Sequence, residues 1–219
     1  MIRTTIFYLF FPITVSGQVN EVVSRLLADS SIIGLDSSLF QATDTNRKNK
    51  RNQLHGVWRV RGKEDSRLLY IATYLNGERH GPSIGFFPNE KIATSTYHKF
   101  GIEVGPGQEF WQNGHQRSIR HFKDGMVEGI VKLFDTTGQL TRVFEIRDGK
   151  KEGDEIVFYP SGNIRIVTRY LKGQEHGIRN LYRDKGNPVL ISQCDISMGV
   201  LEAERFYENG IVVWTESYK

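Results

Sequence analysis

The chain has 219 residues, of which 38% are hydrophobic and 22 are glycine, and its formal net charge is +4. The low hydrophobic share and the many glycines favour a thin, turn-rich structure over the thick core of a large enzyme. The charge is too small and too evenly spread to indicate nucleic-acid binding.

The first seventeen residues have the order of a secretory signal peptide. Arg3 supplies a positive charge, an apolar run follows over residues 6–13, and small residues precede Gln18. The run is shorter than the roughly 20 residues of a membrane-spanning helix and contains Pro12. An N-terminal strand fits this order less well. We therefore expect residues 1–17 to be cleaved and the protein to be periplasmic, on the outer envelope or secreted, in a bacterium.

Residues 18–54 form a leader without a repeating pattern. Apolar residues recur at helical spacing over residues 19–28, which predicts a short helix that caps one end of the structure. Residues 46–52 carry a basic run. We interpret this run as a solvated turn rather than as a site for an anionic surface.

From His55 to Lys219, glycines recur in columns with a period of 24 residues. A fixed period of this length indicates a repeat architecture. We therefore expect these glycines to be structural. Two of the columns consist of Gly81, Gly105, Gly129, Gly153 and Gly177, and of Gly114, Gly138, Gly162, Gly186 and Gly210.

Each copy of the repeat has the composition of a β-hairpin. Residues 154–159 and 164–170 are rich in β-formers, and residues 160–163 have turn chemistry. The sequence therefore predicts an all-β fold, a single-layer meandering antiparallel sheet of tandem hairpins over residues 55–219. An extra residue is expected between Gly62 and Ser66. Glu90, Ser197 and Leu201 stand where the period expects glycine.

Alternation along the second strand of a copy predicts its two faces. It places Ile164, Ile166 and Tyr170 together on a more apolar face. Val167 and the arginines beside it, Arg165 and Arg169, point the other way. We expect this second, mixed face to meet water, as in a sheet of one layer.

The repeat pattern resembles the variant MORN repeats of bacterial proteins, often grouped under a YwqK-type antitoxin label. The resemblance rests on residues 124–129, 148–153 and 172–177, and on the hairpin tips 112–114 and 208–210. It covers residues 55–219. It implies a binding or scaffolding surface and supplies no general catalytic residues.

We interpret the histidines and the cysteine, which often act as catalytic residues or metal ligands, as structural residues of the repeats. His55, His80 and His176 each precede a column glycine and are too far apart to converge on one metal. Cys194 has no partner for an internal disulfide and falls in the column of Tyr170, so we expect it to pack inward. We expect no catalytic residue, no metal and no cofactor, and hence a protein that is not an enzyme.

The sequence thus favours an exported, non-catalytic scaffold that contacts an unknown protein or an envelope component. The alternatives are a binder of envelope glycan or lipid headgroups, and an antitoxin-like neutralising protein. Aromatic and arginine side chains suit protein contacts, although packing within the sheet is the alternative for each aromatic. The candidate surface consists of Phe110, Trp111, Tyr159, Tyr182, Tyr207, Arg165 and Arg169.

Overall fold

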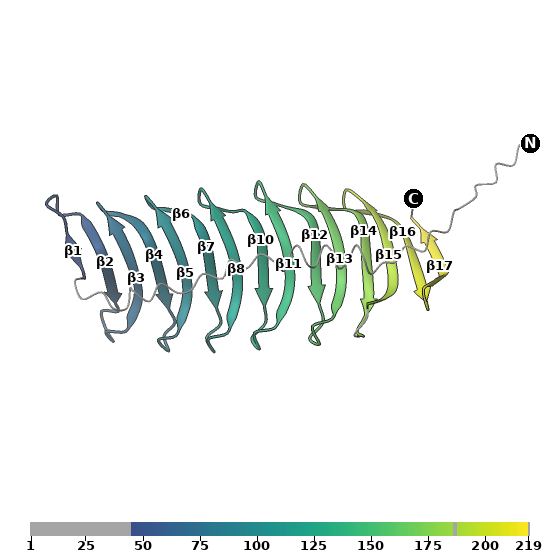
Figure 1. Ribbon diagram of the computed structural model, residues 1–219, viewed down its shortest axis with the longest axis horizontal. Coiled ribbons are helices and arrows are strands. Elements are labelled where there is room, and N and C mark those ends of the chain that lie inside the picture. Colours follow the sequence, from purple (N-terminus) through teal and green to yellow (C-terminus); the bar gives the residue numbers. More distant parts are fainter. Residues whose placement is uncertain (1–44, 186–187, 219) are drawn as a thin grey trace, which may run out of the picture.

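The computed structural model describes residues 45–185 and 188–218 (Figure 1). The predicted signal peptide, the predicted helix over residues 19–28 and Gly186 lie outside these ranges. Within them, the seventeen strands belong to one open, meandering antiparallel sheet, and no segment is helical. The all-β, single-sheet expectation is therefore confirmed.

The strands follow one another across the sheet in chain order. They are β1 (Arg47–Lys48), β2 (Leu54–Arg61), β3 (Leu68–Leu75), β4 (Glu78–Phe86), β5 (Ile92–Lys99), β6 (Ile102–Glu103), β7 (Gly105–Phe110), β8 (Gln116–Lys123), β9 (Met126–Val127), β10 (Gly129–Phe134), β11 (Leu140–Arg147), β12 (Lys150–Phe158), β13 (Ile164–Leu171), β14 (Gln174–Arg183), β15 (Val189–Ser197), β16 (Val200–Glu208) and β17 (Ile211–Ser217). The short strands β6 and β9 continue into β7 and β10, which pair with β5 and β8.

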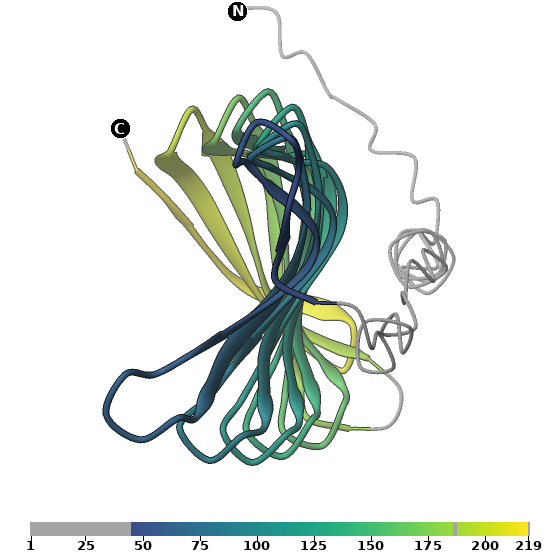
Figure 2. The same cartoon turned by 90° about the vertical axis from the view of Figure 1, so that its left-hand side faces the viewer.

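The sheet is a long, curved ribbon. Figure 2 looks along its long axis and shows that the strands bend, and that the β2 end is rotated relative to the β17 end. The right-handed twist of each strand pair accumulates in this way when many strands follow one another. A surface made of successive strands therefore changes direction steadily along the molecule.

One rim of the sheet is made of two-residue turns that bond to the preceding repeat. Lys172 and Gly173 take positive φ values of 52° and 88° in the turn between β13 and β14. The N–H of Gly173 donates to the carbonyl of Lys151 at 2.9 Å. The same bond between repeats joins Gly77 to Leu54, Gly101 to Arg79, Gly125 to Glu103 and Gly199 to Glu175.

The second column glycine stands at a bulge in several repeats, as at Gly81, Gly153 and Gly177. Gly177 has φ 89°, and the pairing of β13 with β14 shifts between Thr168 and Tyr170. The residue before this glycine accepts a hydrogen bond from the next short turn: Glu152 accepts from the N–H of Lys172 at 2.8 Å. The same position is held by His80, which accepts from Phe100, by Glu128, which accepts from Asp148, and by His176, which accepts from Met198.

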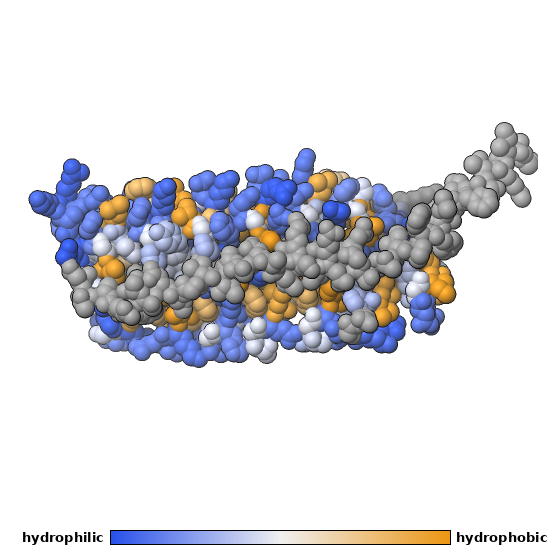
Figure 3. All heavy atoms as spheres, in the orientation of Figure 1, coloured by the Kyte–Doolittle hydropathy of each residue, from blue (hydrophilic) through white to orange (hydrophobic). Residues whose placement is uncertain are grey.

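The opposite rim carries the longer hairpin tips, and the first of these contains the expected extra residue. The N–H of Gly62 donates to the carbonyl of Arg67, whereas the corresponding bond of the next tip joins Phe87 to Lys91. Figure 3 shows hydrophilic residues gathered along this lower rim. Glu90 takes a positive φ of 62° in the tip where the period expects glycine.

The last repeat is out of step with the period. Its short-turn glycine is Gly199, 26 residues after Gly173, and Ser197 pairs with Val200 across that turn. Leu201 pairs with Ile196 beside a shorter bulge, so this position needs no glycine. Beyond residue 185, the 24-residue period therefore no longer assigns residues to their structurally equivalent positions.

The buried core lies on the face that the sequence assigned to water. Val143, Ile156 and Val167 stand opposite one another on β11, β12 and β13 and are at most 9% exposed. Ile164 packs against this cluster together with Phe158. The expected separation of Ile164 from Val167 is wrong because the pairing shifts between Val157 and Phe158, which breaks simple alternation. A second cluster contains Ile71 and Ile84.

Candidate binding surface

The two faces of the sheet differ in the chemistry of their central rows. We call the face that carries Ile84, Val143 and Ile156 the core face. The opposite face, which we call the ladder face, carries Glu155 opposite Thr168, and Arg179 opposite Thr168 and Cys194. The central row of the ladder face is thus charged and polar from β12 to β14 and ends at Cys194 on β15.

The ladder face is hollowed over strands β4 to β8. The hollow measures about 480 Å³. Its central side chains are small, and these are Ser83, Gly85, Thr94, Thr96, Gly107 and Ser118. The corresponding rows farther along carry larger residues, for example Leu133 opposite Arg142 and Val157 opposite Ile166. The hollow therefore exists because one stretch of the array lacks large side chains on this face.

Two glycines at the base of the hollow have no room for a side chain. A Cβ at Gly107 would lie 2.6 Å from the Cε2 atom of Phe122, whose ring therefore needs the glycine. A Cβ at Gly85 would lie 2.7 Å from the hydroxyl oxygen of Thr94. Both glycines stand outside the recurring columns of the sequence, so they are specific to this stretch.

Charged and aromatic groups surround the hollow. Arg120 donates to the Oε2 atom of Glu109 at 2.9 Å, and the hydroxyl of Ser118 donates to the same oxygen at 3.1 Å. The guanidinium of Arg79 lies 5.4 Å from the centre of the Tyr70 ring. The hollow thus offers hydroxyls, an ion pair that is about one-third exposed and a cation–aromatic pair to a ligand.

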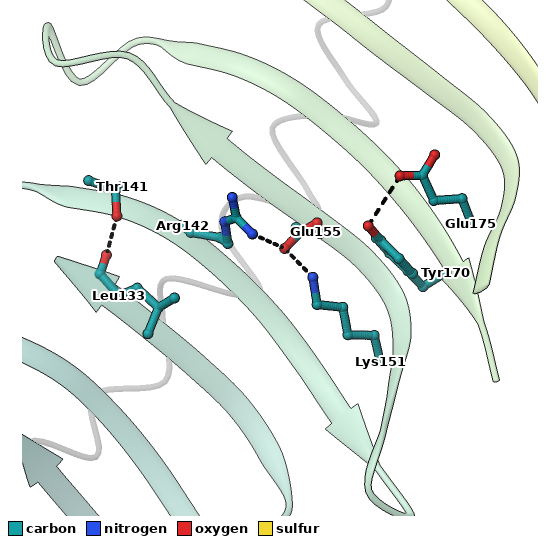
Figure 4. Close-up of polar contacts among 7 residues, drawn as sticks. All are labelled: Leu133, Thr141, Arg142, Lys151, Glu155, Tyr170 and Glu175. Carbon is teal, nitrogen blue, oxygen red and sulfur yellow. Dashed lines mark hydrogen bonds and ion pairs between the residues drawn. The ribbon is translucent and has the colours of Figure 1, made fainter. Parts of the chain in front are cut away.

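Farther along the ladder face, charged side chains fill the surface themselves. Figure 4 shows Glu155 between Lys151 and Arg142. The Oε1 atom of Glu155 lies 2.6 Å from Lys151 Nζ and 3.4 Å from Arg142 Nη1, and the Glu155 side chain is only 6% exposed. The same ammonium lies 4.8 Å from the ring centres of Phe144 and Tyr170. Lys151 is therefore held by one carboxylate and two aromatic faces.

The ladder continues through Tyr170 to Cys194. The hydroxyl of Tyr170 donates to Glu175 at 3.3 Å, as Figure 4 shows, and Arg179 donates to the other Glu175 oxygen at 3.1 Å. Burial, followed by the nearby carboxylates of Glu155 and Glu175, raises the pKa of Tyr170. This phenol stays protonated at neutral pH.

Cys194 is buried, as the sequence predicts. It stands opposite Arg179 and Glu204. Arg179 Nη2 lies 3.7 Å from its sulfur. Burial raises the pKa of the Cys194 thiol and outweighs the effect of Arg179, so the reactive thiolate is disfavoured.

One residue of the sequence-predicted surface is buried. Tyr182 is 0% exposed and belongs to the core cluster with Ile156 and Val167, so it is not available for binding. Burial raises its pKa to about 12. The sequence could not distinguish an exposed aromatic residue from a buried one, because residues of the same aromatic column pack on the core face.

Trp111 and Tyr159 join neighbouring hairpin tips. The indole N–H of Trp111 donates to the carbonyl of Phe134 at 3.1 Å, and the hydroxyl of Tyr159 donates to the carbonyl of Tyr182 at 2.9 Å. The guanidinium of Arg165 lies 5.6 Å from the centre of the Tyr159 ring. These aromatics therefore have a role within the array.

The remaining predicted surface residues are not gathered into one patch. Phe110 is half-buried and stands opposite Gln116. Tyr207 donates from its hydroxyl to Gln193 at 3.3 Å, and exposed Arg169 lies 3.8 Å from Asp154. Within the predicted set, the interactions described above join Tyr159 to Arg165 and to the carbonyl of Tyr182. The sequence missed the hollow, although Gly85 and Gly107, outside the glycine columns, were a signal for it.

The histidines have structural surroundings. His80 and His176 accept backbone hydrogen bonds between repeats, and across the described ranges no three histidine, cysteine, aspartate or glutamate residues are grouped as metal ligands. His98 is buried beside the hollow, and its Nε2 atom lies 3.8 Å from Glu103. Burial lowers the pKa of His98, and the carboxylate of Glu103 only partly offsets this effect.

Comparison with known proteins identifies one repeat. Residues 151–172 match a family model described as a MORN repeat variant, and the equal spacing of the other copies supports a MORN-repeat protein. No curated protein matches the chain. A chain in the crystal structure of accessory secretory protein 1, 2 and 3 of Streptococcus pneumoniae is similar over 46% of this chain and 18% of that chain, with 17% identity and a TM-score of 0.30. In the part of the chain that the structure describes, no helix is long and apolar enough to cross a membrane.

Proposed function

We propose that this protein is a non-catalytic repeat scaffold that binds a protein partner across the hollow of its ladder face. The hollow over β4–β8 is the observation that carries the proposal. It contrasts with the part of the same face around Glu155, which ion pairs and aromatic rings fill. A MORN-type array supplies a rigid frame, and residues that differ between copies determine what the frame binds.

The chemistry of the hollow supports a protein as the partner. Tyr70 and Phe122 offer apolar area, and Arg79 with the Glu109–Arg120 pair offers both signs of charge. Protein interfaces combine an aromatic and arginine centre with a polar rim in this way. A catalytic site would require a nucleophile or base with a poised partner, and Cys194 is instead a protonated, buried thiol.

Export is part of the proposal and rests on residues 1–17. Their order of charge, apolar run and small residues supports a signal peptide. N-terminal sequencing of the natural protein tests it, and Gln18 as the first residue is the expected result. Full-length protein in the cytosol would overturn export and favour an antitoxin-like role.

A pair of threonine substitutions tests the hollow. Thr94 is exposed inside it, and Thr136 is exposed at a hairpin tip away from it. Thr94→Tyr fills the hollow, whereas Thr136→Tyr adds the same group elsewhere. We expect a stoichiometric partner to cross-link and co-purify with the wild type and with Thr136→Tyr, and to lose at least tenfold in affinity with Thr94→Tyr.

Two results would contradict this proposal. One is a partner that binds all three proteins equally well. The other is retention only on isolated envelope glycan or lipid vesicles, without a protein partner. Thermal unfolding of both variants provides the control, because equal midpoints show that Thr94→Tyr acts on binding and not on folding.

A further inference from the structure

The last described strand, β17, exposes apolar side chains on both of its faces. Ile211 is 70% exposed, Val213 57% and Trp214 53%. Val212 and Tyr218 are also exposed. Figure 3 shows hydrophobic residues reaching this end of the molecule. An exposed apolar edge strand is a template for pairing with another strand.

The backbone of β17 has hydrogen-bonding groups that point away from β16. The N–H of Tyr218 donates to the carbonyl of Glu202 at 2.8 Å, and Glu216 stands opposite Glu204. In an antiparallel pair, inward and outward groups alternate along the strand. The N–H and C=O of Thr215 and Ser217 therefore point outward, along an edge where the described strands provide no neighbour.

The opposite edge of the sheet is closed by the chain itself. Strand β1 pairs with Leu54 and His55. Beyond β1, the side chain of Asn46 takes the place of a strand: its Oδ1 accepts from the N–H of Arg59 at 2.7 Å and its Nδ2 donates to the Arg59 carbonyl at 3.1 Å. The N–H of Asn46 also donates to the carbonyl of Val57 at 2.8 Å.

We propose that β17 pairs antiparallel with β17 of a second copy of this chain, about a twofold axis at Thr215, to form a closed dimer. Thr215 then exchanges its N–H and C=O groups with Thr215 of the second copy. The same register puts Trp214 opposite Glu216 and Val212 opposite Tyr218 of the second copy. Threonine pairs and aromatic–β-branched pairs are favourable across strands, and no two like charges face each other directly.

The exposed apolar area is close to the lower limit for a specific interface. The five apolar residues of this edge are 41–70% exposed, and together they offer on the order of 500 Å² per copy. A pair of copies then approaches the roughly 1,000 Å² that marks the lower limit of a specific interface. Because β17 pairs with itself and β2 is covered by β1 and Asn46, the assembly stops at two copies.

Charge distinguishes this dimer from a head-to-tail assembly. The β17 end carries four glutamates, Glu202, Glu204, Glu208 and Glu216, against Arg205 on β16, so two such ends repel each other at low salt. Added salt screens this repulsion and strengthens the dimer. The other end carries Arg47, Lys48, Lys50 and Arg51. A head-to-tail assembly would join acidic to basic ends, so it would weaken with salt and grow beyond two copies.

The first test measures mass in solution by sedimentation and light scattering. Val213→Lys places a charge on β17, and Val200→Lys places the same charge on an equally exposed valine, 66% exposed, outside β17. We expect dimers for the wild type and for Val200→Lys, and at least tenfold weaker dimerisation for Val213→Lys. A monomeric wild type at 100 µM, on the order of weak natural dimers, or higher oligomers that salt dissolves, would overturn the proposal.

The second test locates the axis by oxidation. In a Cys194→Ser background, Thr215→Cys places its thiol opposite its own copy, where paired Cα atoms lie about 5.5 Å apart, within the range of a disulfide. A disulfide-linked dimer is expected for Thr215→Cys but not for Val200→Cys. Equal cross-linking of both variants would reject this register. Since the hollow over β4–β8 is distant along the sheet from β17, partner binding by the dimer is measured separately and neither outcome decides the other.

Discussion

Strands β4–β8 and strands β10–β15 have the same backbone frame but opposite surfaces. In the first region, Gly107 occupies a row of the ladder face that Val131 and Glu155 occupy in the second. The first region is therefore hollow, and the second is filled by ion pairs and aromatic rings. The frame fixes where side chains stand, and the side chains that vary between copies decide whether a surface is filled or open.

The core face shows the same contrast. Val143, Ile156 and Val167 form a continuous apolar row in the second region. In the first region, Ser95 stands opposite Gln108 in this row. The core face is thus polar in its central row over β5 and β7, whereas it is apolar there over β11, β12 and β13.

The largest expected effect is the loss of a core isoleucine in the filled region. Ile156→Ala removes a side chain that is 0% exposed and packs between Val143 and Val167. We expect the free energy of unfolding to fall by about 3 kcal/mol. Ile119→Ala is the matched change in the first region, where Gln108 and Lys132 stand opposite it. Its expected cost is about 2 kcal/mol, the lower end of the range for such a change, and equal losses in urea unfolding would remove the contrast.

A smaller effect is expected from the two carboxylates. The Glu155 side chain is only 6% exposed, and Glu155→Ala removes the carboxylate that pairs with Lys151 and Arg142. We expect the free energy of unfolding to fall by about 2 kcal/mol. Glu109→Ala breaks a pair with Arg120 in which both side chains are about one-third exposed. That loss should be about 0.5 kcal/mol because water replaces the partner. Urea unfolding of both variants measures the difference, and a larger loss for Glu109→Ala would contradict it.

The smallest expected effect is on the pH dependence of folding stability, and it comes from His98 in the first region. Burial lowers the pKa of His98 in the folded state, so the unfolded chain binds this proton first as the pH falls. His98 therefore contributes a loss of stability that begins as the pH drops through about 6.5, the usual histidine value. The stability of His98→Gln should decline less than that of the wild type between pH 7.5 and 5.5. Parallel unfolding curves for the two proteins over this range would exclude His98 as the source.

The sequence predicted the frame because backbone geometry repeats strictly. Gly173 recurs because the second residue of each short turn takes a positive φ, and Gly177 recurs because the bulge that follows also needs one. The hairpins and the single sheet follow from this period. The roles of His80 and His176 could also be inferred, because an acceptor is needed at the same place in every repeat.

The surfaces could not be predicted to the same extent because bulges change which face a residue occupies. Ile164 packs with Val167 although both alternation and spacing separate them. Tyr182 belongs to a column that includes half-buried Phe110, yet it is fully buried. The hollow depends on several strands meeting with small residues in one place, which is a property of the register and not of any one copy.

The bonds from each short-turn glycine to the preceding repeat reach only one repeat back, as from Gly173 to Lys151. A repeat can therefore be added or removed as a unit while all the others keep their contacts. Each added pair of strands both lengthens the ribbon and rotates its end. The number of repeats thus sets both the distance and the relative angle between two molecules that bind at the two ends of the sheet.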